Sequence, residues 1–181
     1  MSDSHHPLEL FHYCPRCGSA HFAEHDPRSK KCQDCGFLYY FDAAAATVCV
    51  LVNERHELLV CRRARDPQKG TLDLPGGFVD PGEDIESGML REIKEETGMS
   101  AHIERFLFSL PNTYLFSGFE VATADCFFLC KVDGECQPQA SDDAAELLWL
   151  KKEEICPEDF GLDSVRKGII RLRDNFPEIW K

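Results

Sequence analysis

The hydrophobic and polar positions of this chain change period several times, which predicts a succession of strands and helices. Apolar runs bounded by turn residues predict strands at 43–52, 58–61, 71–74, 103–109, 124–132 and 147–150. Residues 53–56 have the composition of a turn, so the first two strands should form a hairpin. Residues 163–175 repeat apolar side chains at helical spacing and predict a packing helix. We therefore expect an α/β fold in which a mixed sheet carries helices on both faces.

Another helix is predicted between Asp84 and Gly98. Ile85, Met89 and Ile93 lie four residues apart, which gives this segment an apolar face for packing against a core. Asp84 can cap the N-terminus, and Gly98 suits the residue that ends a helix in the left-handed conformation. The segment is therefore expected to be a short amphipathic helix with one polar face.

The polar face of this helix carries three carboxylates. Glu92 and Glu96 project about 40° from each other on a helix, and Glu95 joins the same stripe. Like charges four residues apart destabilise a helix by a few tenths of a kcal/mol. A divalent cation removes this repulsion, and hard cations such as Mg²⁺ prefer oxygen ligands. A solvated acidic helix is the alternative, but it does not explain the glycine-rich loop at residues 74–78 before it.

Residues 77–99 resemble the Nudix box, G-x5-E-x7-R-E-U-x-E-E-x-G-U, in which U is an apolar residue. The specified positions are filled by Gly77, Glu83, Arg91, Glu92, Ile93, Glu95, Glu96, Gly98 and Met99. The resemblance implies a Nudix-type α/β/α sandwich and a hydrolase that uses Mg²⁺ or Mn²⁺. It also implies that Glu92 and Glu96 are the principal metal ligands, with Glu95 close by and the carbonyl of Gly76 as a further ligand.

Two C-x2-C pairs stand near the beginning of the sequence, at Cys14, Cys17, Cys32 and Cys35. Two such pairs separated by fourteen residues are typical of a tetrahedral structural zinc site. Disulfides are the alternative, but residues 1–13 show no apolar secretory segment, so we expect reduced thiols and a cytoplasmic location. The remaining cysteines are expected to be reduced, buried small residues at positions 49, 61, 126, 130, 136 and 156.

The expected organisation is a zinc ribbon at residues 1–41 followed by a Nudix hydrolase domain at 42–181. Some forty residues cannot build a large core, so zinc is expected to stabilise the ribbon. The ribbon carries four Lys or Arg against five Asp or Glu. This balance is not the basic footprint of a nucleic-acid-binding module, which argues against the alternative that the ribbon recruits RNA.

The net charge of −12 is concentrated in residues 42–150, which hold twenty acidic against nine basic residues. Such a surface does not attract phosphates by itself, and it is explained if metal ions bind first and act as counterions of the substrate. No hydrophobic run reaches transmembrane length, and the seven histidines show no ligand pattern.

Further features resemble the NADH pyrophosphatase branch of the Nudix family, which carries a four-cysteine ribbon directly before the Nudix domain. Glu146 precedes Trp149 by the offset of a family metal ligand, and Tyr40 follows Cys35 by five residues, as does a family tyrosine that contacts substrate. The family signature S-Q-P-W-P-F-P-x-S corresponds here to residues 109–117, without the tryptophan. This segment is expected to be a substrate loop, with Leu110, Pro111, Asn112, Tyr114, Phe116 and Ser117 as substrate-binding residues.

The resemblance implies hydrolysis of the diphosphate linkage in a nucleoside diphosphate derivative such as NADH, ADP-ribose or FAD. Glu95 or Glu146 is the expected general base, and Glu83 and Arg91 are expected to hold the loop and helix together. The large N-terminal domain of the longer enzymes is not present in this sequence. The alternatives are a non-catalytic Nudix ligand sensor and an enzyme that removes NAD caps from RNA. A homodimer is expected from the relatives, and no membrane partner is expected.

Overall fold

The computed structural model describes residues 6–116, 118–133 and 144–181 of the chain. The chain folds as two units, Met1–Ala43 and Ala44–Lys181. The assignment of residues 1–41 to a ribbon and 42–181 to a hydrolase domain stays a prediction. No helix in the described part of the chain is long and apolar enough to cross a membrane.

The smaller unit is a three-stranded antiparallel sheet. Its strands are β1 (Phe22–Asp26), β2 (Ser29–Cys32) and β3 (Leu38–Tyr40), in the order β1-β2-β3. Its buried core consists of Phe22 and the two cysteines Cys14 and Cys32. Even with the buried Leu8, this core is too small to stabilise a unit of this size by the hydrophobic effect alone, so a further cross-link is needed.

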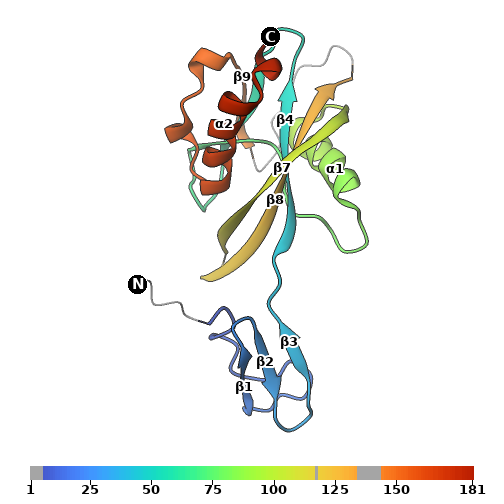
Figure 1. Ribbon diagram of the computed structural model, residues 1–181, viewed down its shortest axis with the longest axis vertical. Coiled ribbons are helices and arrows are strands. Elements are labelled where there is room, and N and C mark those ends of the chain that lie inside the picture. The colour runs from blue at the N-terminus through green and yellow to red at the C-terminus, as the bar shows by residue number, and fades with distance from the viewer. Residues whose placement is uncertain (1–5, 117, 134–143) are drawn as a thin grey trace. The chain divides into compact units, whose positions relative to one another are not determined.

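A mixed six-stranded sheet forms the centre of the larger unit (Figure 1). Its strands are β4 (Ala44–Val52), β5 (Leu58–Arg63), β6 (Leu72–Asp73), β7 (Ala101–Phe116), β8 (Phe119–Val132) and β9 (Ala144–Leu150). The order is β6-β5-β4-β8-β7, and β9 pairs with β5. Strands β4 and β8 run parallel, whereas the other pairs are antiparallel. The predicted mixed sheet is confirmed.

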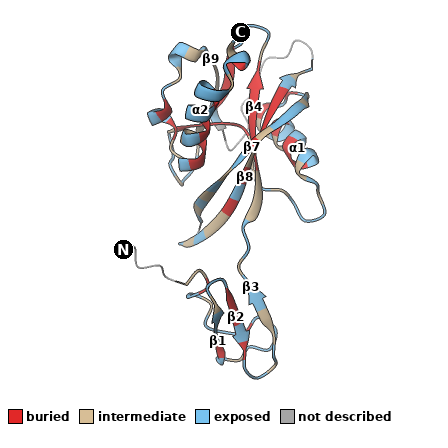
Figure 2. Cartoon of the chain, viewed as in Figure 1, coloured by how far each residue is buried: buried red, intermediate tan, exposed pale blue. Residues whose placement is uncertain are grey.

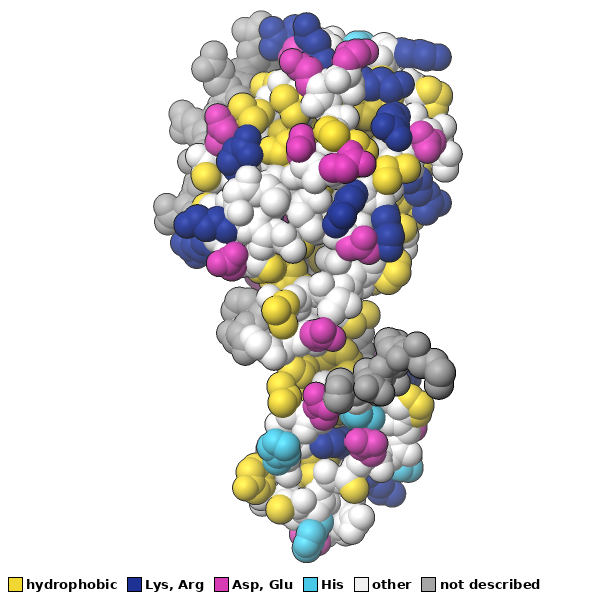
Figure 3. All heavy atoms as spheres, turned by 90° about the vertical axis from the view of Figure 1, so that its left-hand side faces the viewer, with side chains coloured by type: hydrophobic (Ala, Val, Ile, Leu, Met, Phe, Trp, Pro, Cys, Tyr) yellow, Lys and Arg dark blue, Asp and Glu magenta, His cyan; other side chains and the backbone are white. Residues whose placement is uncertain are grey.

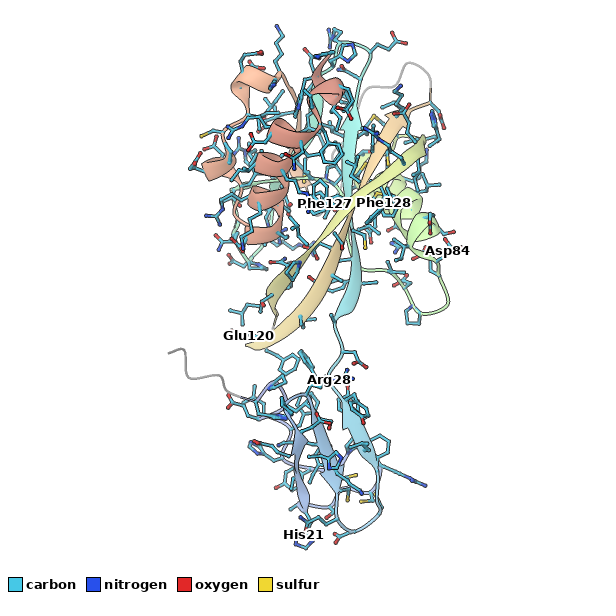
Figure 4. The ribbon with its side chains drawn as sticks, in the orientation of Figure 1. His21, Arg28, Asp84, Glu120, Phe127 and Phe128 are labelled. Atoms are coloured by element: carbon cyan, nitrogen blue, oxygen red, sulfur yellow. The ribbon has the colours of Figure 1, made fainter. Side chains whose placement is uncertain are left out.

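Helices α1 (Ile85–Thr97) and α2 (Asp163–Asn175) pack on opposite faces of this sheet (Figure 1). A hydrophobic core lies on each face of the sheet, and successive residues of β8 point into different cores. Phe127 belongs to the same core as Ile169 of α2, and Phe128 to the same core as Ile93 of α1. Figure 4 labels the two phenylalanines on β8, and Figure 2 shows the buried residues gathered in the strands and on the inner faces of the helices. The predicted α/β/α arrangement is confirmed.

Both ends of α1 agree with the prediction. The side chain of Asp84 accepts a hydrogen bond from the backbone N–H of Ser87 at 2.7 Å, and Gly98 adopts a left-handed φ of 69°. The predicted C-terminal helix at residues 163–175 is confirmed as α2. Short 3-10 segments at Lys152–Glu154, Pro157–Asp159 and Pro177–Trp180 flank α2 in the sequence.

One predicted loop is a strand. Residues 109–116 continue β7 and pair with β8 up to a turn at Gly118, so the expected substrate loop was wrong for this segment. The loop was expected from the resemblance to the family signature, and Pro111 is the residue of this segment that suits a strand least. It is tolerated here because β7 is the edge strand of the sheet, where a missing backbone donor is not costly.

Candidate active site

The glycine-rich loop before α1 lies along the edge of β4. The backbone N–H of Thr47 donates to the carbonyl of Gly77 at 2.8 Å, and that of Cys49 donates to the carbonyl of Pro75 at 2.7 Å. Strand β5 pairs with β4 only at the end of β4, so this part of the β4 edge is free to bind the loop. The loop is therefore fixed to the sheet by backbone hydrogen bonds before α1 begins.

Two consecutive glycines allow this close approach. Gly76 has a φ of 146°, and a Cβ on it would lie 2.1 Å from the backbone oxygen of Thr47. A Cβ on Gly77 would lie 2.5 Å from the Oε1 atom of Glu92. One glycine thus packs against β4 and the next against a carboxylate of α1. At Gly76 only a residue without a side chain fits against the strand, and at Gly77 a side chain would displace the carboxylate of Glu92.

A cleft of about 430 Å³ opens where the loop, sheet and helices meet. It brings together five of the residues predicted from sequence as site residues: Gly76, Glu92, Glu96, Asn112 and Tyr114. Glu92 and Glu96 come from α1, Gly76 from the loop, and the other two from β7. Segments far apart in the sequence therefore form one concave surface, the usual form of a small-molecule site.

Arg91 ties the loop to the helix. Its guanidinium donates to both carboxylate oxygens of Glu83, at 3.1 and 3.0 Å, and to the carbonyl of Phe78 at 3.0 Å. It also donates to Glu92 at 2.8 Å and to Glu95 at 3.0 Å. These hydrogen bonds hold the pKa of Glu83 below its usual value. The predicted role of Glu83 and Arg91 in holding the loop and helix together is confirmed.

The two carboxylates of α1 that line the cleft are held differently. Burial raises the pKa of Glu92, and the nearby charges of Glu95 and Asp80 raise it further, although Arg91 acts in the opposite direction. The Oε2 atom of Glu96 accepts a hydrogen bond from the backbone N–H of Gly76 at 3.0 Å. A half-buried carboxylate with other acids beside it is a site where a cation would be stabilised.

The other two predicted catalytic glutamates are not among the residues that line the cleft. Glu95 has a 60% exposed side chain that pairs with Arg91. Glu146 lies on β9 opposite Arg62 of β5, and the Nε and Oε2 atoms of this pair are 3.2 Å apart. Among the described residues, no three acidic side chains have their oxygens within 4.8 Å of one another, a spacing that the four cysteines do reach. Arg91 therefore balances the charge of Glu95, and Arg62 balances that of Glu146.

The substrate-binding residues predicted on β7 lie on two different faces of the strand, and only one face borders the cleft. Asn112 and Tyr114 line the cleft, and Leu110, on the same face, packs against the hydrophobic core. Pro111 points to the opposite face and is exposed. The prediction for Ser117 lies outside the described residues, as does that for the side chain of Phe116. Tyr40 is on β3 of the smaller unit, where Arg28 lies 5.0 Å from its ring centre.

Two buried carboxylates of the cleft wall, Asp73 and Asp125, were not predicted from the sequence. Arg63 donates to Asp73 at 2.5 Å, to the hydroxyl of Tyr114 at 3.0 Å and to the carbonyl of Pro67 at 2.7 Å. Burial raises the pKa of Asp73 although Arg63 acts to lower it. On β8, Asp125 is also buried in this wall. The only sequence signal was the presence of charged residues at inward-facing positions of otherwise apolar strands.

The four cysteines of the smaller unit form a second site. Their sulfur atoms all lie within 4.8 Å of one another, and the pairs Cys14–Cys35 and Cys17–Cys32 are each 3.7 Å apart. A zinc ion with Zn–S bonds of about 2.3 Å in a tetrahedron requires sulfurs about 3.8 Å apart. These distances are too long for disulfides, which need about 2.05 Å. The four residues therefore match a zinc site in both chemistry and spacing.

Glycines shape both halves of this site. Gly18 and Gly36 have φ values of 74° and 73°, and their N–H groups donate to the carbonyls of Cys14 and Cys32 at 2.8 and 3.0 Å. Backbone N–H groups, first that of Cys35, lower the pKa of the Cys32 thiol. All described cysteines are free. The prediction that the other six are buried was wrong for Cys156, which is exposed, and for Cys126, which is half-buried, while Cys136 lies outside the described residues.

The surface charges are mixed on the face that Figure 3 shows. Lys and Arg side chains stand between Asp and Glu side chains there, and hydrophobic side chains are scattered among them. The net charge of −12 therefore does not form a single acidic surface on this face.

Known proteins resemble this chain over most of its length. The NUDIX domain family matches residues 42–172. NAD-capped RNA hydrolase NudC of Vibrio vulnificus is 27% identical over 152 residues, which are 84% of this chain and 55% of that protein. ADP-ribose pyrophosphatase of Methanocaldococcus jannaschii is 31% identical over 139 residues, which are 76% of this chain and 78% of that protein. The NUDIX hydrolase structure from Nitrosomonas europaea superposes with a TM-score of 0.74 at 20% identity, covering 92% of each chain.

These similarities differ in what they establish. The chain spans about half the length of the NudC relatives that it matches. The likeness to the Nitrosomonas europaea structure supports the fold. The family match covers the loop, α1 and the two cleft-lining carboxylates of α1, and the four-cysteine cluster precedes it as the sequence predicted. Fold, box geometry and family match agree, and the chain belongs to the NUDIX domain family.

Proposed function

We propose that this protein is a divalent-metal-dependent hydrolase that cleaves the diphosphate linkage of a nucleoside diphosphate derivative. The observation that carries the proposal is the cleft in which Glu92 and Glu96 of α1 meet the Gly76–Gly77 loop. The names of the relatives support it, because they describe an NAD-capped RNA hydrolase and an ADP-ribose pyrophosphatase. The alternative of a non-catalytic sensor is disfavoured because every carboxylate of the box is retained.

The cleft offers the oxygen donors that Mg²⁺ or Mn²⁺ requires. Glu92 and Glu96 would hold the ion, and Gly76 lines the same cleft with its backbone. Glu95 lies one turn from Glu92 and shares Arg91 with it, so a small movement of Arg91 would release both carboxylates. A bound divalent cation would neutralise phosphate charge and lower the pKa of an attacking water.

Arg63 is placed to bind a phosphate oxygen. A guanidinium has five N–H groups, and three hydrogen bonds from Arg63 to described residues leave two for a ligand. Its partners Asp73 and Tyr114 fix its orientation, so little side-chain entropy is lost when a ligand binds. We therefore assign Arg63 to the diphosphate, on the same cleft as the carboxylates of α1.

The general base is assigned to Glu95 or Glu146. Both are exposed and paired with an arginine, at Oε–N distances of 3.0 and 3.2 Å. A carboxylate paired in this way can accept a proton from the attacking water once the arginine moves. The rate of the wild-type enzyme should fall at low pH as the general base becomes protonated. If this fall disappears in only one of the variants Glu95→Gln and Glu146→Gln, the residue replaced in that variant is the base.

Substrates of the NADH, ADP-ribose or FAD type are proposed, with NAD-capped RNA as the second candidate because of the NudC relatives. We assign the substrate side chains to Asn112 and Tyr114, which line the cleft. The roles of Tyr40, Leu110 and Pro111 in substrate binding stay predictions, as do a homodimer and a cytoplasmic location. Zinc is proposed as the structural ion of the four cysteines.

The test is a hydrolysis screen of purified protein against nucleoside diphosphate derivatives, with and without Mg²⁺ or Mn²⁺. Glu92→Gln and Glu96→Gln should each lower kcat by about 10²–10³-fold and weaken metal binding, because each removes a charge from the metal site. Glu86→Gln is the matched control, since Glu86 is an exposed acid in the first turn of the same helix. Turnover that is independent of added metal, or equal losses in Glu86→Gln, would contradict the proposal.

A further inference from the structure

One wall of the cleft is built from β7, β8 and the start of α2, and it contains the carboxylate of Asp125. This residue is only 5% exposed, yet it lines the cleft. Its Oδ1 atom accepts a hydrogen bond from the hydroxyl of Thr123 at 2.6 Å, and its Oδ2 atom accepts one from the hydroxyl of Ser164 at 2.5 Å. These described donors are neutral hydroxyl groups. The hydrolysis proposed above assigns no role to this carboxylate.

Each oxygen of Asp125 keeps further acceptor capacity. A carboxylate offers about four acceptor sites, and the two hydroxyl groups occupy one on each oxygen. Because the donors come from β8 and from α2, they fix the carboxylate plane from two elements of the fold. A buried acceptor with capacity to spare favours a ligand that donates hydrogen bonds and rejects one that cannot.

The neighbours of Asp125 are suited to a planar ring. Leu162 and Val165, at the start of α2, give this wall an apolar surface. Asn112 of β7 lies directly opposite Thr123 in the register of the hairpin and adds an amide to the same face. An apolar surface beside a few polar groups matches the faces and the edge of a heteroaromatic ring. The negative charge of Asp125 repels phosphates, so the diphosphate does not bind against it.

We propose that Asp125 determines substrate specificity by accepting a hydrogen bond from an N–H group on the ring portion of the substrate. The inference rests on the proposed function in one respect: nucleoside diphosphate derivatives are taken as the ligands of the cleft. Two parts of a dinucleotide carry such a group: the amino group of adenine and the carboxamide of nicotinamide. In the bound substrate, one of them lies against Asp125, while the diphosphate lies toward Arg63 and the carboxylates of α1.

The test measures binding of paired ligands by calorimetry, so that it does not depend on turnover. NAD⁺ is compared with nicotinic acid adenine dinucleotide, and ADP-ribose with its N6,N6-dimethyladenine analogue. The wild-type protein should bind the N–H-bearing member of one pair about 10- to 100-fold more tightly, the effect of a hydrogen bond to a charged group. The pair that shows the preference identifies which ring contacts Asp125.

Asp125→Asn should reduce this preference to a few-fold at most, because an amide retains the shape but replaces one acceptor oxygen with a donor and carries no negative charge. Thr123→Val removes one hydroxyl that orients the carboxylate and should reduce the preference by a smaller factor; it carries the test if Asp125→Asn fails to fold. Glu120→Gln, at an exposed position of β8 that Figure 4 labels, is the control for loss of charge and should keep the wild-type preference.

Two results would overturn the inference. One is a wild-type protein that does not distinguish the members of either pair, and the other is a preference that persists in both Asp125→Asn and Thr123→Val. The outcome is separable from that of the proposed function. A protein that shows the preference but hydrolyses none of the ligands would retain the Asp125 subsite and lose the proposed reaction.

Discussion

Replacement of Gly77 by alanine tests whether the position of Glu92 carries the function of the cleft. A Cβ at Gly77 would lie 2.5 Å from Oε1, 2.6 Å from Cδ and 2.8 Å from Oε2 of Glu92. Ordinary van der Waals contact begins at about 3.4 Å, so the carboxylate must move by about 0.9 Å. The clashing atoms are the end of a flexible side chain, and Gly77 does not have a left-handed φ.

The expected result is therefore a loss of function without a loss of fold. The free energy of unfolding should change by less than about 1 kcal/mol, since alanine also restricts the unfolded chain. A misplacement of about 1 Å in a catalytic constellation can cost about 10²-fold in rate, so kcat/KM should fall by about that factor. Mn²⁺ affinity, measured by titration calorimetry, should fall in parallel, and thermal unfolding followed by circular dichroism should report an intact protein.

Two other glycines between β6 and α1, Gly82 and Gly76, provide controls. Gly82→Ala meets no heavy atom within 4 Å but has a φ of 89°, so it should cost about 1–2 kcal/mol of stability and leave Mn²⁺ binding unchanged. Gly76→Ala collides with the backbone of Thr47 and should destabilise the fold. If Gly77→Ala acts by moving Glu92, it should add little further loss in a Glu92→Gln background. Wild-type Mn²⁺ affinity in Gly77→Ala would refute the reasoning.

Three further predictions concern the ribbon, the box and the core. Metal analysis should find one zinc per chain, absent from Cys32→Ser, whereas zinc retained by that variant would exclude the four-cysteine site. Because Arg91 holds the pKa of Glu83 low, that pair contributes stability above about pH 4.3 and loses it as the pH falls through the folded pKa. The difference in Tm between wild type and Glu83→Gln should accordingly disappear on acidification, and a difference independent of pH would contradict this. Gly168→Ala places a Cβ 2.4 Å from the ring of Phe127 and should lower the unfolding free energy by about 1–3 kcal/mol in urea titrations, although alanine favours helices; an increase would show that α2 can move away from the sheet.

The local elements, the four-cysteine cluster and the contacts within the box were readable from the sequence. The ends of α1 are set by Asp84 and Gly98, whose effects operate within one turn of the helix. The C-x2-C pairs place their thiols through local turns, and two sulfur–sulfur contacts between the pairs complete the site. The bidentate pair of Arg91 and Glu83 is formed within the box itself. Such features depend on few neighbours, so a short stretch of sequence specifies them.

The cleft, by contrast, was decided by the tertiary structure. The alternation of β7 places Asn112 and Tyr114 in the cleft and directs Pro111 away from it, and this depends on pairing with β8 rather than on residues nearby in the sequence. Arg63 and Asp125 reach the same cleft from different strands, and the contacts that orient them, such as that of Ser164 with Asp125, come from segments distant in the sequence. Sequence determines what each segment can form, but long-range pairing and burial determine which polar side chains share one wall, because those energies depend on neighbours distant along the chain.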